Sequence, residues 1–187
     1  YADQQPLYEQ LDFHVGTLTG TNADWVRKHL SLWRCPADIG PDAYSATVPG
    51  SGTFEVSHGN YAANARMMSA LSSISFSHVT DGLSNTVMLG ERGWSSDSAA
   101  HRFTSGWYGT LATATNQGFG SVAHLEMLAD FPVNFLVGGA ECFSSHHQGG
   151  AILAIGDGSV RFVSEDADSG VLAAAGTIAG GEEGRLP

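Results

Sequence analysis

The chain has 187 residues, of which 42% are hydrophobic and 14% are charged, a size that suits one hydrophobic core and predicts a single domain over residues 1–187. The 19 acidic side chains outnumber the 8 basic ones, and the formal charge of -11 argues against nucleic acid or an anionic membrane surface as a partner. No apolar stretch approaches the roughly 20 residues needed to span a bilayer.

The first third of the chain predicts two helices and a loop. Apolar residues recur at near-helical spacing in 6–13, which predicts a short amphipathic helix. A second helix is expected from Asn22 to Trp33, with Asn22 or Asp24 as its cap and Pro36 after its end. Residues 37–57 are rich in Asp, Gly, Pro, Ser and Thr and predict a long loop.

The middle of the chain predicts short strands. Runs of strand-forming residues occupy 59–63, 75–79 and 86–89, and a polar turn at 80–85 separates the last two. Between 94 and 134, aromatic residues stand among glycines and serines. This pattern predicts loops and short strands, with a helical turn at 122–129.

A hairpin is the clearest local prediction. The apolar run 151–155 and the alternating run 160–163 flank Asp157-Gly158, and this pattern is typical of two strands joined by a type I′ turn. The polar residues 164–168 then provide the cap of a short helix predicted through 171–175.

No enzyme motif stands out, which favours a protein that is not an enzyme: a Gly-x-Ser-x-Gly elbow and a phosphate-binding glycine loop are both missing from the sequence. His147 and Asp157 form a His, nine residues, Asp-Gly pattern that would suit metal ligands or an acid-base pair. However, a strand rises about 3.3 Å per residue, so the two side chains are expected at opposite ends of the first hairpin strand. In the alternative interpretation, His147 donates to a backbone carbonyl and Asp157 adopts the left-handed turn conformation.

Calcium is the metal that the composition favours, because it prefers carboxylate and carbonyl oxygens from glycine-rich loops. The candidate ligands are acidic or amide side chains next to turns: Asp81, Glu91 and Asp157, together with Asn85, Asp38 and Asp42. None of them forms an EF-hand pattern. The alternative is that each aspartate accepts hydrogen bonds from the backbone amides of its own turn.

Two further sets of residues carry predictions. Cys35 and Cys142 are far apart without CxxC spacing, so one long-range disulfide is expected if the compartment is oxidising. Trp94, Trp107 and Tyr108 lie in a glycine-rich stretch and would form a stacking platform for a sugar. The alternative for these rings is a place in the core or in an interface between copies of the chain.

Several segments occur in a characteristic order: residues 1–13, Trp-Arg-Cys-Pro-Ala-Asp at 33–38, Asn-Tyr-Ala at 60–62, Val-Thr-Asp-Gly-Leu-Ser-Asn-Thr at 79–86, Gly-Glu at 90–91, Ser-Ser-His-His-Gln-Gly-Gly-Ala at 144–151 and Gly-Asp-Gly-Ser-Val-Arg-Phe at 156–162. This set resembles a bacterial pilin-like family. Its members carry a prepilin-type N-terminal cleavage and methylation segment and a C-terminal His-X9-Asp-Gly motif, which here comprises His147, Asp157 and Gly158.

The resemblance implies an α+β fold, the globular head of a pilin or type II secretion pseudopilin, with an antiparallel sheet, short helices and long loops. The family's hydrophobic N-terminal helix, its only membrane contact, is absent from this sequence, so we expect that it has been removed or left out. The expected function is an extracellular or cell-surface structural subunit that assembles with copies of itself into a filament. The resemblance also supports calcium, because related pseudopilins bind it. The alternative function is a secreted module that binds a solute or polysaccharide through Trp94, Trp107 and Tyr108.

Overall fold

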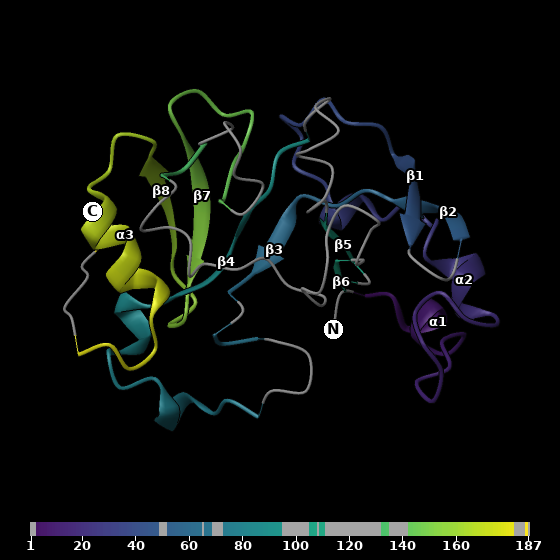
Figure 1. Cartoon of the computed structure of the whole chain (residues 1–187), viewed down its shortest axis with the longest axis horizontal. Helices are drawn as coiled ribbons and strands as arrows, with labels where there is room; N and C mark the ends of the chain where they lie inside the picture. The colour runs from purple at the N-terminus through teal and green to yellow at the C-terminus, as the bar shows by residue number, and fades with distance from the viewer. Residues whose placement is uncertain are drawn as a thin grey trace.

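A computed structural model (Figure 1) describes residues 3–48, 52–64, 66–68, 73–94, 105–107, 109–110, 132–134, 142–181 and 186. Its largest sheet has four antiparallel strands in the order β3-β4-β7-β8, with β3 at Tyr61–Ala63, β4 at Val87–Glu91, β7 at Gly150–Ile155 and β8 at Val160–Ser164. The helix α3, Ser169–Gly176, follows β8.

Two smaller antiparallel pairs complete the strands: β1 (Ala43–Val48) with β2 (Gly52–Ser57), and β5 (Ser105–Gly106) with β6 (Gly109–Thr110). The other helical elements are short, namely α1 (Gln5–Tyr8), α2 (Asn22–Trp25) and the 3-10 turns η1 (Ser31–Trp33), η2 (Phe76–His78) and η3 (Leu83–Asn85). The predicted α+β class, with antiparallel sheets and short helices, is confirmed. No helix among the described residues is long and apolar enough to cross a membrane.

The large sheet buries one face. Alternate residues of β7 and Val163 of β8 point into a core that also contains Phe143 and residues of α3. The side chains of this core are Ala62, Val87, Val133, Phe143, Ala151, Leu153, Ile155, Val163, Leu172, Ala175 and Leu186. Asp168 accepts hydrogen bonds from the backbone N–H groups of Gly170 and Val171, and so caps α3 on this core. We call residues 59–94 and 142–181, as far as they are described, the sheet region.

A second, smaller core lies in the N-terminal region, residues 3–48 and 52–58. Val26, Ala46 and Val56 are its buried members, and Leu18, Tyr44 and Phe54 pack against them half-buried. In Figure 1 this region, with α1, α2, β1 and β2, lies at the opposite end of the long axis from β8 and α3. The molecule therefore has one core near each end.

The predicted hairpin is present, but its turn is of a different kind. Within the turn 155–159 only Gly158 has a positive φ, +87°, so Asp157 does not adopt the left-handed conformation that a type I′ turn requires. The N–H of Gly158 donates to the carbonyl of Ile155, and the N–H of Ile155 donates to the carbonyl of Ser159. This is a type I turn followed by a left-handed glycine, and Asp157 stabilises it by accepting a hydrogen bond from the N–H of Ser159 (2.9 Å).

Three local predictions were wrong. The helix expected from Asn22 to Trp33 is interrupted, because α2 ends at Trp25 and a separate turn, η1, covers Ser31–Trp33. The expected loop at 37–57 contains β1 and β2, and the expected strand at 75–79 is the 3-10 turn η2. The helical turn predicted at 122–129 lies outside the described residues.

Candidate functional site

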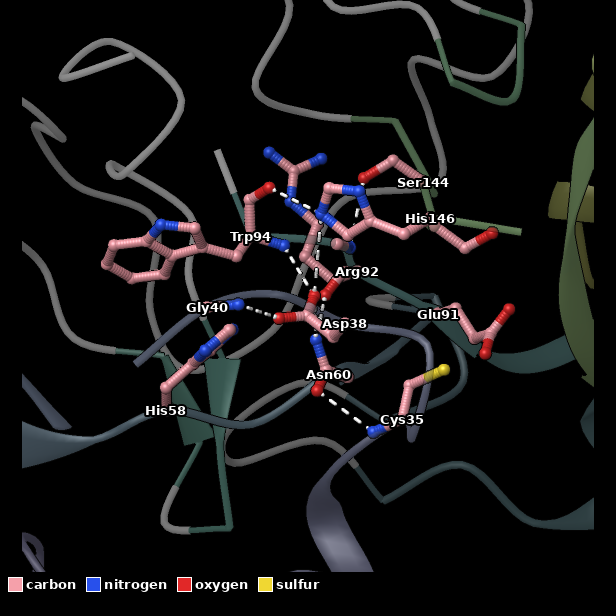
Figure 2. Close-up of polar contacts among 12 residues, drawn as sticks. Cys35, Asp38, Gly40, His58, Asn60, Glu91, Arg92, Trp94, Ser144 and His146 are labelled. Carbon is pink, nitrogen blue, oxygen red and sulfur yellow. Dashed lines mark hydrogen bonds and ion pairs between the residues drawn. The ribbon is translucent and has the colours of Figure 1, made fainter. Parts of the chain in front are cut away.

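Buried polar side chains meet where the N-terminal region contacts the sheet region. Four segments contribute: residues 33–42, residues 57–60, the end of β4 with residues 92–94, and residues 142–147 (Figure 2). We call this set of contacts the polar junction. A buried polar group without a hydrogen-bond partner destabilises the fold, so each group of the junction is expected to have a partner.

Asn60 lies at the centre of the junction and is 1% exposed. Its side-chain oxygen accepts from the N–H of Cys35 (2.9 Å), and its amide nitrogen donates to Asp38 (2.6 Å) and to the carbonyl of Arg92 (2.9 Å). Its backbone N–H donates to Trp33. One side chain therefore connects the loop after η1 to the end of β4.

Asp38 is the buried acceptor of the junction, with a side chain 1% exposed. Its carboxylate accepts from the N–H of Gly40 (2.6 Å) and of Trp94 (2.7 Å), in addition to Asn60. The guanidinium of Arg34 lies 3.5 Å from the same carboxylate and also donates to the carbonyls of Gly40 and Pro41. Figure 2 shows the dashed contacts converging on Asp38. Such charge-assisted hydrogen bonds are stronger than neutral ones and offset the cost of burying the charge.

Residues after β4 connect the junction to the segment 142–147. The buried Arg92 donates to the carbonyl of Cys142, and the N–H of Gly93 donates to the carbonyl of Ser144 (2.8 Å). An imidazole nitrogen of His146 lies 2.9 Å from the carbonyl oxygen of Trp94 and 3.8 Å from the Asp38 carboxylate. These contacts extend the strand-like pairing of β4 beyond the sheet.

Cys35, Glu91 and His147 form a compact group next to Asn60. The Nε2 atom of His147 lies 3.2 Å from Oε1 of Glu91 and 3.4 Å from Sγ of Cys35. One donor atom from each residue lies within 4.8 Å of the other two. Glu91 and Cys35 are buried, and the side chain of His147 is 32% exposed.

Electrostatics keep the thiol of this group protonated. Burial raises the pKa of Cys35 above its ordinary value, the hydrogen bond with the Ala37 backbone lowers it by less, and the nearby Glu91 carboxylate raises it further. Burial also raises the pKa of Tyr61, and its electrostatic interactions with the nearby Cys35 and Glu91 raise it further. A protonated thiol is a poor nucleophile. The same nitrogen of His147 also faces both partners, so the ring does not relay a proton from Cys35 to Glu91 through its two nitrogens.

The predicted calcium ligands do not come together. Among the described residues, the one convergent group of His, Cys, Asp or Glu donors is the one with Cys35, and it contains Glu91 but neither Asp81 nor Asp157. Asp157 accepts from its own turn. Asp81 accepts from the N–H groups of Gly180 and Gly181 and from the Thr177 hydroxyl (2.8–2.9 Å), so it fastens the segment after α3 to the turn at η3. The turn-capping alternative therefore describes Asp157, whereas Asp81 binds a distant segment and not its own turn.

The remaining calcium candidates also have other partners. Asn85 donates to the carbonyl of Asp81, and the exposed Asp42 lies 3.4 Å from His29. The carboxylate of Asp38 accepts hydrogen bonds within the polar junction. His147 contacts Glu91 and Cys35, and within the described part of the chain its ring makes no bond to a backbone carbonyl. Asp157 lies at the hairpin turn, at the other end of β7 from His147, as the strand geometry predicts.

The predicted disulfide is not present, because Cys35 and Cys142 are both free, buried cysteines. Cys35 directs its sulfur to His147, whereas the main-chain carbonyl of Cys142 accepts a hydrogen bond from Arg92.

The aromatic residues predicted to form a platform have separate partners. Trp94 packs against His58 and Tyr44 (ring centroids 4.9 and 5.5 Å apart), and Trp107 donates its indole N–H to the carbonyl of Lys28. Tyr108 lies outside the described residues.

Arg34, Asn60 and Arg92 are site residues that the reasoning from residue types did not single out. The signal that pointed to them is the ordered set of short segments. Those at 33–38, 60–62, 90–91 and 144–151 are separated along the chain but meet at the polar junction. The residues that carry the resemblance are therefore largely the residues that build this site.

Comparison with known proteins gives one match. Residues 1–170 match the family described as a protein of unknown function, DUF1559 (SBP_bac_10). No curated protein matches the chain, and no solved structure does. Since the match covers most of the 187 residues, the chain belongs to the DUF1559 family.

Proposed function

We propose that this protein is a non-enzymatic structural subunit, the head of a pilin-like protein, and that it assembles head to tail with copies of itself outside the cell or at its surface. The observation that carries the proposal is a pair of exposed apolar patches at opposite ends of the long axis. An interface between two different patches repeats without closing, which produces a filament.

The first patch lies at α1. Tyr8 is 59% and Phe13 is 66% exposed, and their rings contact each other in a tilted arrangement with centroids 5.0 Å apart. Val15 lies close by in sequence and is 40% exposed. Solvated aromatic pairs of this kind are typical of surfaces that become buried on association.

The second patch lies on the outer face of β8. Val160 and Phe162 are 65% and 52% exposed, and they alternate with the buried Val163. Their strand partners on β7, Ala154 and Ile152, are half-buried, so this sheet face is aliphatic and aromatic across two strands. Figure 1 shows α1 and β8 at opposite ends of the molecule.

Two double variants test the head-to-tail arrangement. Tyr8→Ser with Phe13→Ser removes the α1 patch, and Val160→Thr with Phe162→Thr removes the β8 patch. In sedimentation velocity over a concentration series, we expect the wild type to form species larger than a dimer and each variant alone to remain monomeric. An equimolar mixture of the two variants should form a dimer, because it retains one intact pair of patches.

Ile39→Ser is the matched control, because Ile39 is 78% exposed but belongs to neither patch. It should associate like the wild type. A wild type that stays monomeric at all concentrations contradicts the proposal, and so does a mixture that associates no better than its two components.

A second candidate function is saccharide binding. An open groove of about 610 Å³ is lined by Tyr8, Trp33 and Trp107, together with Leu7, Leu11 and Leu30. Aromatic rings at the edge of such a groove suit stacking on a sugar. Glycan-array binding that is lost on Trp107→Ala, by a protein that remains monomeric, would favour this function over self-assembly.

A further inference from the structure

We propose that Cys35, Glu91 and His147 form a binding site for a thiophilic divalent cation, for which Zn²⁺ is the natural ion. The three residues supply one sulfur, one oxygen and one nitrogen donor, which is a set that zinc accepts in proteins. The site is independent of self-assembly, so either proposal stands without the other.

The spacing of the donor atoms supports a shared ion. Bonds of about 2.0–2.3 Å at tetrahedral angles place zinc ligands roughly 3.3–3.6 Å apart. The observed separations are 3.4 Å from Cys35 Sγ to His147 Nε2 and 3.2 Å from that nitrogen to Glu91 Oε1. The sulfur and the carboxylate oxygen lie within 4.8 Å of each other, so these two atoms need to approach most for all three to surround one cation.

The direction of the imidazole supports the same conclusion. Nε2 of His147 faces both the sulfur and the carboxylate oxygen, and a single ring nitrogen has only one hydrogen or one lone pair to offer. Without a cation, the imidazole nitrogen bonds to one of these partners, and the Cys35 thiol is hydrogen-bonded to Glu91. A cation at their centre replaces these hydrogen bonds: the thiol releases its proton to solvent, and sulfur, nitrogen and oxygen each direct a lone pair at the ion.

Surrounding contacts hold each ligand in place. The second carboxylate oxygen of Glu91 accepts from the N–H of Ile152 (2.7 Å), and the N–H of Cys35 donates to Asn60. The backbone N–H of His147 donates to the hydroxyl of Ser145 (3.1 Å). Contacts of this kind orient metal ligands and lower the cost of assembling the site. Figure 2 shows Cys35 held by Asn60, with its sulfur on the side of Glu91.

The three ligands differ in burial. Cys35 and Glu91 are 6% and 3% exposed, whereas the side chain of His147 is 32% exposed. His147 is therefore the ligand nearest to solvent, and a water completes the fourth position of a bound ion. Calcium does not suit the site, because it takes six to eight oxygen ligands and this group offers a single carboxylate.

Metal binding to the purified, chelator-treated chain tests the proposal. Titration with Zn²⁺ against a chromophoric chelator should give one ion per chain and a raised melting temperature. Co²⁺ should give the near-ultraviolet absorption of a thiolate-cobalt bond together with the visible bands of a tetrahedral site. Cys35→Ser should abolish the thiolate band, and Cys35→Ser, His147→Gln and Glu91→Gln should each weaken Zn²⁺ binding at least tenfold.

The chain provides two matched controls. Cys142→Ser removes the other buried cysteine, and His146→Gln removes the neighbouring histidine, which contacts Trp94 instead. Both should bind Zn²⁺ within twofold of the wild type, and circular dichroism identifies any variant that fails to fold. The proposal is overturned if the folded wild type binds no Zn²⁺ at micromolar concentration, or if the controls lose as much affinity as the ligand variants.

Discussion

The two regions of the molecule are stabilised in different ways. Among the described residues, the sheet region contributes nine of the eleven side chains of one continuous core, whereas the core of the N-terminal region has three buried residues. The N-terminal region is instead held by charged and amide side chains at the polar junction, with Asp38 and Asn60 at its centre. The comparison indicates that apolar burial maintains one end of the molecule and buried hydrogen bonds fix the other end to it.

The largest effect is expected at the junction. Asp38→Ala leaves three donors, on Gly40, Asn60 and Trp94, without their acceptor, and leaves Arg34 without its carboxylate. We expect a loss of about 3 kcal/mol in the free energy of unfolding, measured by urea denaturation. Asp42→Ala is the control, because that side chain is 75% exposed, and it should change stability by less than about 0.5 kcal/mol. Equal losses of stability in the two variants would contradict the proposed role of the polar junction in stability.

A matched pair of valines sharpens the comparison of the two cores. Val163 on β8 and Val56 on β2 are both 0% exposed, and the experiment replaces each of them separately with alanine. Val163→Ala should cost about 2 kcal/mol, because the dense core around it cannot close the cavity, and Val56→Ala should cost about 1 kcal/mol. Urea denaturation of both variants measures the difference. A larger loss for Val56→Ala would reverse our description of the cores.

The smallest effect concerns a carboxylate at the surface of the sheet region. Burial raises the pKa of Asp81, but the N–H groups of Gly180 and Gly181 and the hydroxyl of Thr177 outweigh it and hold the pKa below its ordinary value. The unfolded state then binds more protons, so this stabilisation is present above about pH 4 and is lost as the pH falls through the lower, folded value. Melting temperatures between pH 2 and 5 should fall less steeply for Asp81→Asn than for the wild type. Identical slopes would contradict the role of these hydrogen bonds.

Sequence reasoning succeeded where structure is local. The hairpin β7-β8 and the cap of α3 depend on neighbouring residues, and both were predicted. The strands β1 and β2 were missed, because their Ser, Thr and Gly content is typical of a loop and their deeply buried apolar residues among those described are only Ala46 and Val56. Their pairing depends on packing against Val26, which the local pattern does not reveal.

The site was less accessible to sequence reasoning, because its contacts join distant positions. Cys35 and His147 are 112 residues apart, and nothing in the spacing shows which carboxylate the imidazole meets. Strand geometry correctly predicted that β7 separates His147 from Asp157, but the sequence did not indicate that Glu91 is the carboxylate beside His147. The ordered motifs identified the correct segments without showing how they pack together.

Hydrogen exchange on Asp38→Ala tests most directly whether the polar junction fixes the N-terminal region to the sheet region. Under native conditions, amides of β1 and β2 should lose protection while those of β7 and β8 keep the protection they have in the wild type. A uniform loss of protection in all four strands would show that both regions unfold as one unit and would contradict the account.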